Sequence, residues 1–193
     1  MPDEDADPRI LRSRAKLLAA ATALLMESGP QAVTVDAVAE RSGVAKSTMY
    51  RHWPSRDDLL LAVMRAHHPI ISTPDLGGGF ETALRALLAE VADTFAEPEW
   101  ASILPALIAL QHHRPELTEL LAEDRRAQLS VLAAVLEAGR TEGYVPLGID
   151  LQTSADLLFG PLLLATLRGE RGRLHELAGH SVDRFIAGLG ASS

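Results

Sequence analysis

The 193-residue sequence predicts an all-α protein. Alanine and leucine, the strongest helix formers, are the most abundant residues, whereas the strand-favouring aromatic residues are few: two Trp, two Tyr and four Phe. Apolar residues recur at helical spacing, and clusters of Gly and Pro separate the periodic segments. The chain is long enough to bury a core without cross-links, and the absence of cysteine excludes disulfides and thiolate metal sites.

The first helix is expected to begin at Asp7-Pro8, because aspartate is a good N-cap and proline fits the first helical turn. It should end at Gly29-Pro30. Its apolar periodicity predicts a buried stripe made of Leu11, Ala15, Leu18, Ala21 or Thr22, and Leu25.

Three shorter helices are expected next, over about 35–41, 45–52 and 56–67. Thr34 is a good N-cap for the first of them, and Gly43 lies in the turn that follows it. Pro54 closes the second. Ser55 caps the third, with Asp58 in a capping-box-like position.

Residues 69–79 are rich in helix breakers and mark the expected domain boundary. Five further helices are expected over about 80–96, 99–112, 115–142, 151–169 and 174–189. The predicted organisation is therefore an acidic flexible tail (1–8), a first domain with a connecting helix (9–68) and a second domain (69–193).

The segment from Thr34 to Leu59 has the spacing of a helix-turn-helix. Ala39 supplies the small residue where the two helices cross, and Gly43 supplies the positive φ of the turn. Apolar residues flank the turn and enter the second helix, at Val35, Val38, Val44 and Met49. That helix fits the DNA major groove and should expose side chains that bond DNA, namely Lys46, Ser47, Arg51 and His52.

The net charge of −8 conceals an uneven distribution. Residues 9–65 hold nine Lys or Arg against five Asp or Glu, whereas residues 66–193 hold nine against seventeen. A basic N-terminal third on an acidic body predicts one module that faces a polyanion. The alternative is chance clustering in a short window.

The run VAKSTMYRHWPSR, residues 44–56, resembles the N-terminal signature of TetR-type bacterial transcriptional regulators. In that family a similar Tyr-x-His-aromatic run ends the recognition helix, and a basic residue follows three positions on. The resemblance covers residues 11–65, and the runs at 142–146 and 156–162 resemble common versions of the family's C-terminal bundle. It implies an N-terminal three-helix helix-turn-helix DNA-binding domain and a C-terminal helical bundle for ligand binding and dimerisation.

The resemblance also implies roles for single residues. Base edges are expected to face Lys46, Ser47 and Arg51. Phosphate contacts are expected at Thr34, Thr48, Tyr50, His52 and Arg56, whose hydroxyl, imidazole and guanidinium groups suit phosphate oxygens. The chain departs from the family pattern at Ala45, where a capping serine is common, and at Arg56, where lysine is usual.

Small-molecule sites in helical bundles lie between helices and are lined by apolar and aromatic side chains with a few polar groups. The candidates here are Phe95, Trp100, Ile103, Leu107, Gln111, His113, Gln128, Phe159 and Leu163. Each is also an ordinary core candidate. The expected effector is an apolar or amphipathic small molecule.

The family pattern implies a two-fold homodimer, built as a four-helix bundle from the last two helices of each chain. The small residues Ala155, Gly160 and Ala165 permit close helix approach. The expected interface residues are Leu158, Leu162, Val182, Phe185, Ile186 and Leu189. Packing within one chain is the alternative.

Other classes of function find little support in the sequence. Adjacent histidines at 67–68 and 112–113 point to different sides of a helix, so neither a metal site nor a cofactor is expected. No Gly-x-Ser-x-Gly elbow or Gly-x4-Gly-Lys run occurs, so no catalytic residues are expected. The longest apolar stretch, 157–167, is shorter than the roughly 20 residues of a membrane span, and residues 1–7 lack the character of a secretory signal.

The sequence therefore predicts a cytoplasmic, ligand-responsive transcriptional regulator and not an enzyme. It would be a repressor that binds double-stranded palindromic operator DNA as a homodimer and is nucleoid-associated when bound. The alternatives are an activator, a regulator controlled by a protein partner, and a helical enzyme or lipid-binding bundle that retains the N-terminal hairpin.

Overall fold

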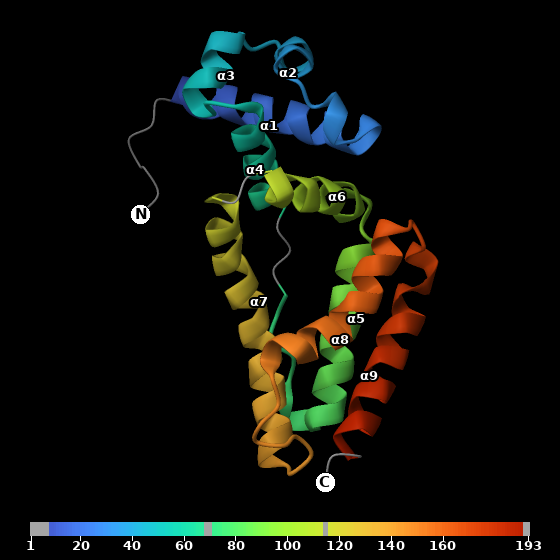
Figure 1. Cartoon of the computed structure of the whole chain (residues 1–193). Coiled ribbons are helices and arrows are strands. Elements are labelled where there is room, and N and C mark those ends of the chain that lie inside the picture. Colours follow the sequence, from blue (N-terminus) through green and yellow to red (C-terminus); the bar gives the residue numbers. More distant parts are fainter. Residues whose placement is uncertain (1–7, 68–70, 114–115, 191–193) are drawn as a thin grey trace. The chain divides into compact units, whose positions relative to one another are not determined.

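A computed structural model describes residues 8–67, 71–113 and 116–190, with side chains except at 106–107, 109–113, 116–125 and 127–128. These residues form helices and no strand, which confirms the all-α class (Figure 1). The α-helices are α1 (Pro8–Ser28), α2 (Val35–Ser42), α3 (Lys46–His52), α4 (Arg56–Ala66), α5 (Phe80–Ala96), α6 (Pro98–His113), α7 (Glu116–Thr141), α8 (Leu151–Leu167) and α9 (Leu174–Gly190). Three short 3-10 helices, which the sequence did not predict, lie at Pro30–Ala32, Leu76–Gly78 and Arg171–Arg173.

The described residues form two compact units. Unit 1 comprises residues 8–67 together with Ser102–His113, and unit 2 comprises residues 71–101 and 116–190. Helix α6 is therefore divided between the units, whereas the predicted boundary after residue 68 places the whole helix in the second domain.

Local side-chain bonds mark the start of three helices, α2, α4 and α8. The Thr34 hydroxyl accepts from the Ala37 amide at 3.2 Å, as expected of an N-cap, and Asp150 accepts from the Thr153 amide at 2.7 Å. The Ser55 hydroxyl accepts from the Asp58 amide at 3.1 Å and donates to the Asp58 carboxylate at 2.6 Å. The expected cap at Asp7 lies outside the described residues.

In unit 1, α1 packs against α2, α3 and α4. The predicted stripe on α1 is wrong in its first half, because Leu11 is 51% exposed and Ala15 is also exposed. The buried face instead begins at Leu17. The residues of this face have the same helical spacing as the predicted stripe. Toward the N-terminus the face continues through Ser13 and Arg14, whose side chains contact the end of α3. The remaining buried apolar residues of α1 are Ala20, Ala21 and Leu25.

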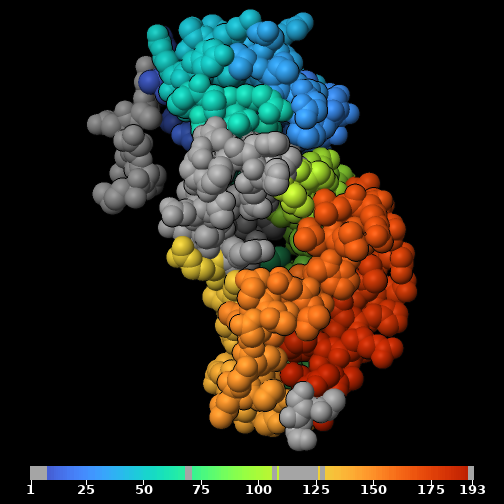
Figure 2. Space-filling view, in the orientation of Figure 1, coloured from blue at the N-terminus to red at the C-terminus, as the bar shows by residue number. Residues whose placement is uncertain are grey.

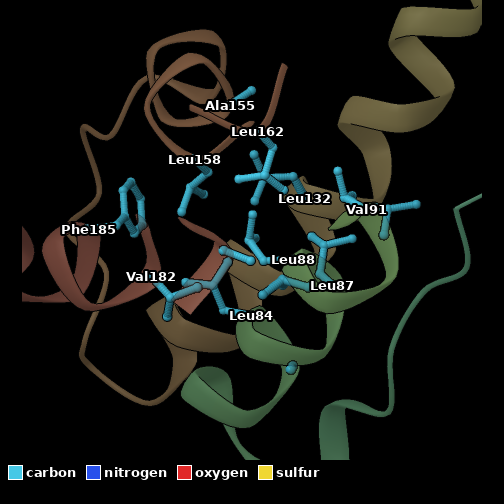
Figure 3. Packing of buried hydrophobic residues seen from close by; sticks show 14 of the residues in the cluster. Leu84, Leu87, Leu88, Val91, Leu132, Ala155, Leu158, Leu162, Val182 and Phe185 are labelled. Carbon is cyan, nitrogen blue, oxygen red and sulfur yellow. The ribbon is translucent and has the colours of Figure 1, made fainter. Parts of the chain in front are cut away.

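In unit 2, α5 packs against α7, α8 and α9, and the core lies among these helices. Figure 3 shows Leu158 and Leu162 of α8 together with Leu88 of α5 and Leu132 of α7. All four side chains are fully buried within the single chain. The core of unit 2 is therefore built without a partner molecule.

This packing corrects the predicted dimer interface. Leu158, Leu162 and Val182 have no exposed area and Phe185 is 9% exposed, so these four residues belong to the core of their own chain. A side chain that is already buried has no surface to offer a second copy. Ile186 and Leu189 pack against the same core but stay partly exposed.

The N-terminus of α5 is held by the end of α7. The Glu142 carboxylate accepts the Phe80 amide through Oε1 at 3.0 Å, directly after Gly79, whose φ is 87°. One turn earlier on α7, a Cβ at Gly139 would lie 2.6 Å from Cδ2 of Phe80 and 2.7 Å from Cγ2 of Val145. Only glycine allows this approach of α7 to α5.

Gly139→Ala should therefore lower the free energy of unfolding by about 1–3 kcal/mol, because the new methyl group overpacks the core against Phe80 and Val145. Denaturant unfolding followed by circular dichroism measures this loss. Gly188→Ala on α9 is the matched control, since a Cβ there meets nothing within 4 Å. Equal stabilities for the two variants would contradict the close approach.

Candidate nucleic-acid interface

Helix α3 has only seven residues, and one of its faces is buried while another is exposed. Met49 is fully buried and Trp53, directly after the helix, is 5% exposed. Lys46, Ser47 and Arg51 are exposed, and Tyr50 is 51% exposed. Figure 2 shows α2 and α3, coloured blue to cyan, at the outer surface of unit 1. The hairpin therefore presents a polar, basic helix face to the outside.

The turn of the hairpin has the geometry that the sequence predicted. Gly43 ends α2 in the left-handed region with φ 67° and ψ 20°, and its amide donates to the Ala39 carbonyl at 3.0 Å. Ala45 precedes α3 without a side-chain cap bond. The start of α3 is thus set by the turn and by burial rather than by a capping side chain.

Helix α1 holds the other end of α3. Ser13 Oγ lies 3.2 Å from Nε2 of His52, and the Arg14 guanidinium carbon lies 5.7 Å from the centroid of the Trp53 ring. Burial, with a smaller contribution from the Arg14 charge, lowers the pKa of His52 below its ordinary value. These contacts fix the direction of α3 on unit 1 and favour a neutral imidazole.

An ion pair joins the two helices of the hairpin. Lys46 Nζ contacts Oδ1 of Asp36, which lies in the first turn of α2. The Asp36 carboxylate raises the pKa of Lys46, chiefly by its hydrogen bond, so Lys46 stays charged. Both side chains remain largely exposed, at 57% and 76%. The sequence predicts Lys46 on the DNA face, but the link to Asp36 depends on how α2 and α3 cross and is seen only in the structure.

Arg56 has partners inside unit 1. Its Nε donates to the Val33 carbonyl at 2.6 Å, its Nη2 donates to the Pro30 carbonyl, and its Nη1 lies 3.4 Å from the Asp57 carboxylate. The side chain is 33% exposed. These bonds fasten the start of α4 to the segment that leads into α2, and they compete with the expected phosphate contact.

Two hydroxyl residues complete the set expected at phosphates. Thr34 is exposed and caps α2, whereas Thr48 is partly buried on α3. Six of the eight predicted DNA residues thus lie in the hairpin's second helix, one caps the first helix and one anchors α4.

The predicted ligand residues are placed less completely. Phe95 and Trp100 come together in unit 2, with ring centroids 6.4 Å apart, and Trp100 is 7% exposed. Phe159 packs against the core of that unit and Leu163 is partly buried, while Ile103, in the part of α6 that belongs to unit 1, is fully buried in the chain. The side chains of the remaining candidates lie outside the described residues; they are Leu107, Gln111, His113 and Gln128.

Two further observations hold for the described part of the chain. It contains no cluster of three or more His, Cys, Asp or Glu side chains that could hold a metal ion. None of its helices combines the length and apolar character needed to cross a bilayer.

Comparison with known proteins agrees with this geometry. Residues 17–63 match the bacterial regulatory proteins of the tetR family, and residues 73–185 match the tetracyclin repressor-like C-terminal domain. The HTH-type transcriptional regulator YdeS of Bacillus subtilis strain 168, itself uncharacterized, is 28% identical over 83% of this chain and 81% of its own length. The HTH-type transcriptional regulator SrpR of Pseudomonas putida is 28% identical over 83% and 76%.

Solved structures show the same fold. A TetR transcriptional regulator from Agrobacterium tumefaciens superposes with a TM-score of 0.70 and 21% identity, over 91% of this chain and 92% of that one. FadR of Bacillus subtilis, solved in complex with stearoyl-CoA, has a TM-score of 0.67 and 17% identity, over 90% and 98%.

A helix-turn-helix that holds a basic helix face outward, on an all-helical chain, defines a DNA-binding transcriptional regulator. The chain belongs to the TetR family. Because the family and the relatives are transcriptional regulators, the alternative of a helical enzyme is set aside.

We expect Arg56→Ala to lower the free energy of unfolding by about 1.5–3 kcal/mol, the range for hydrogen bonds to a charged group. Arg56→Lys should be nearly as unstable, because one ammonium cannot reproduce the fork that serves the carbonyls of Val33 and Pro30. Thermal unfolding measures both. A salt titration of DNA binding distinguishes the roles: a slope reduced by about one per subunit, without a loss of stability, would assign Arg56 to phosphate instead.

Proposed function

We propose that this chain is a ligand-responsive repressor that binds a palindromic operator as a homodimer in the cytoplasm, on the nucleoid. The observation that carries the DNA-binding part is the exposed face of α3, where Lys46, Ser47 and Arg51 project from a helix whose other face is buried. Such a helix fits the major groove and places these three side chains at base edges.

The surrounding polar groups suit the DNA backbone. Phosphate oxygens would accept from hydroxyl and imidazole donors, and the residues proposed for this role are Thr34, Thr48, Tyr50 and His52. Arg56 is proposed to anchor α4 instead, because its Nε and Nη2 donate to backbone carbonyls and its Nη1 lies beside the Asp57 carboxylate. Arg12 and Lys16 of α1 are exposed as well and would add to the attraction for DNA. Phosphate contacts of this kind fix register and orientation but carry no sequence information.

The dimer part is supported by α8, which is apolar on more than one side. While Leu158 and Leu162 enter the core, Leu157 is 62% exposed and Leu164 is 47% exposed on a different face. Pro161 is exposed between them, so the three follow helical spacing along one stripe. An exposed apolar helix face of this kind marks an interaction surface. We therefore propose that this stripe, and not the buried residues, forms the interface. Ile186 and Leu189 of α9, which pack against the core but stay partly exposed, are proposed to take part in it.

Repression and effector control are proposed from the C-terminal half. Its match to a tetracyclin repressor-like domain supports repression, and the bound stearoyl-CoA of FadR supports an apolar or amphipathic effector. Among the residues proposed for the effector site, Phe95 and Trp100 are a pair whose rings lie close together. An effector that binds one conformation better than the other would shift the population away from the DNA-binding state. An activator, or a regulator that answers to a protein partner, is the alternative.

Selection of bound duplexes from a pool of random DNA tests this function directly. We expect a palindromic sequence, whose half-sites lie about 34–36 Å apart or at a multiple of that spacing, because two recognition helices must meet successive major grooves. A pool that gains no common sequence would contradict operator binding, and a single half-site would contradict the dimer.

Arg51→Ala should weaken binding to the selected operator by about 1–3 kcal/mol and weaken binding to random DNA much less, because a base contact is lost. Fluorescence anisotropy with both duplexes measures the difference. Leu147→Ala is the control, since this loop side chain of unit 2 is 86% exposed and has no hydrogen-bonding group to offer DNA. Equal losses on the two duplexes would reassign Arg51 to phosphate.

The double variant Leu157→Asp with Leu164→Asp should be monomeric, folded and unable to bind the operator. Both side chains are exposed in the single chain, so the charges leave the core intact while four of them meet in a two-fold interface. Light scattering after gel filtration reports the mass, and circular dichroism reports the fold. Leu147→Asp is the matched control and should remain dimeric. A double variant that still dimerises would place the interface elsewhere.

A further inference from the structure

The ion pair between Asp36 and Lys46 places a carboxylate on the face that the proposed function turns toward DNA. Lys46 is the first residue of α3, and Asp36 lies in the first turn of α2. Because Oδ1 of Asp36 is within bonding distance of Nζ of Lys46, the carboxylate accompanies the ammonium wherever α3 enters a groove. An acidic side chain at a polyanion interface needs an explanation.

A contribution to folding does not supply that explanation. The two side chains are 57% and 76% exposed, and ion pairs between exposed side chains add little to stability. Asp36 also complements the dipole of α2, but any acidic residue in that first turn would do the same, paired or unpaired. The remaining consequence of the pair is electrostatic: it neutralises the cation that stands at the start of the recognition helix.

We propose that Asp36 is a specificity-determining residue, which suppresses binding of Lys46 to phosphates and directs the pair to a G·C base pair; this rests on the proposed operator binding. An ammonium has three donors and no acceptor, whereas a carboxylate is acceptor-only. In the major groove, guanine presents two adjacent acceptors, N7 and O6, and its cytosine partner presents the N4 amino donor. Lys46 would donate to guanine while Asp36 accepts from cytosine, so both members of the pair are satisfied together.

Other DNA surfaces satisfy the pair less well. A phosphate offers acceptors to Lys46 but repels the carboxylate beside it, so non-operator DNA gains little from this cation. In an A·T pair the N6 donor of adenine separates the two acceptors, adenine N7 and thymine O4, so the ammonium no longer meets two adjacent acceptors on one base. Non-specific affinity depends on the number of phosphates that cations neutralise, and Asp36 therefore lowers it more than it lowers operator affinity.

Asp36→Asn tests this role, because it keeps the shape of the side chain and removes its charge. Glu40→Gln is the matched control: Glu40 is exposed on the same helix, one turn further on, and its loss changes the net charge equally. Each variant is titrated by fluorescence anisotropy against the selected operator and a random duplex over a series of salt concentrations. Thermal unfolding checks that the variants are folded.

Asp36→Asn should bind the random duplex about tenfold more tightly, with a salt dependence steeper by about 0.9 per subunit, and should change operator binding by less than about threefold. In a repeated selection it should lose the preference for G·C at one position of each half-site. Glu40→Gln should leave the ratio of the two affinities unchanged. The combination of Asp36→Asn with Lys46→Ala should remove the gain, because the gain acts through Lys46.

Two results would overturn the role of Asp36: equal affinity ratios for Asp36→Asn and Glu40→Gln, or a change in unfolding temperature alone. A wild-type chain that selects no sequence from the random pool would instead overturn the operator binding on which the role of Asp36 depends. These failures are distinguishable, because the second appears before any variant is made.

Discussion

The burial of Met49 and Trp53 is the constraint on which the DNA-binding face depends. A seven-residue segment is too short to be a stable helix by itself, and α3 has no capping side chain at its start. It is helical because one of its faces completes the core of unit 1. Helix α1 then adds Ser13 and Arg14 at the far end, so the exposed side chains of α3 are held in one direction. Rigid support of this kind is what precise base recognition requires.

The charges of the hairpin balance attraction for DNA against discrimination. The segment 9–65 is basic while the chain as a whole carries −8, so attraction is concentrated on unit 1. Within that unit, cations have different partners: Arg56 bonds backbone carbonyls, Arg41 pairs with Glu27, and Lys46 pairs with Asp36. The proposed roles follow from these partners. A cation committed to the protein anchors the fold, and one with a neighbouring carboxylate is a poor ligand for phosphate alone.

Helix α8 has to satisfy two apolar faces at once. It contains a single charged residue, Asp156, so no polar face separates the side that enters the core from the side that remains exposed. The chain buries Leu158 and Leu162 and leaves Leu157 and Leu164 outside. A helix that is apolar all round is ordinarily buried all round, which is why the exposed stripe is the proposed contact with a second copy.

The sequence by itself determined the helices and the hairpin, because these depend on contacts within a few residues. Thr34 and Ser55 cap the helices they were predicted to cap, and Gly43 has the predicted positive φ. Each capping side chain accepts from an amide three residues further on, and Gly43 lets the chain turn within a single residue. The local sequence is therefore sufficient to predict these features. The exposure of Lys46, Ser47 and Arg51 on α3 was predicted as well, whereas His52, predicted to be exposed, is partly buried against α1.

Only the tertiary structure decided which apolar face is buried where several were available. On the alanine- and leucine-rich α1, two stripes have helical periodicity. The stripe that contains Leu17 enters the core, whereas Leu11 is exposed. On α8 the same choice assigned Leu158 and Leu162 to the interior of their own chain. The partners of Arg56 lie 23 and 26 residues away, and Asp36 meets Lys46 only because α2 and α3 cross. Periodicity shows that a helix has an apolar face, but the packing partner selects the face and the long-range bonds.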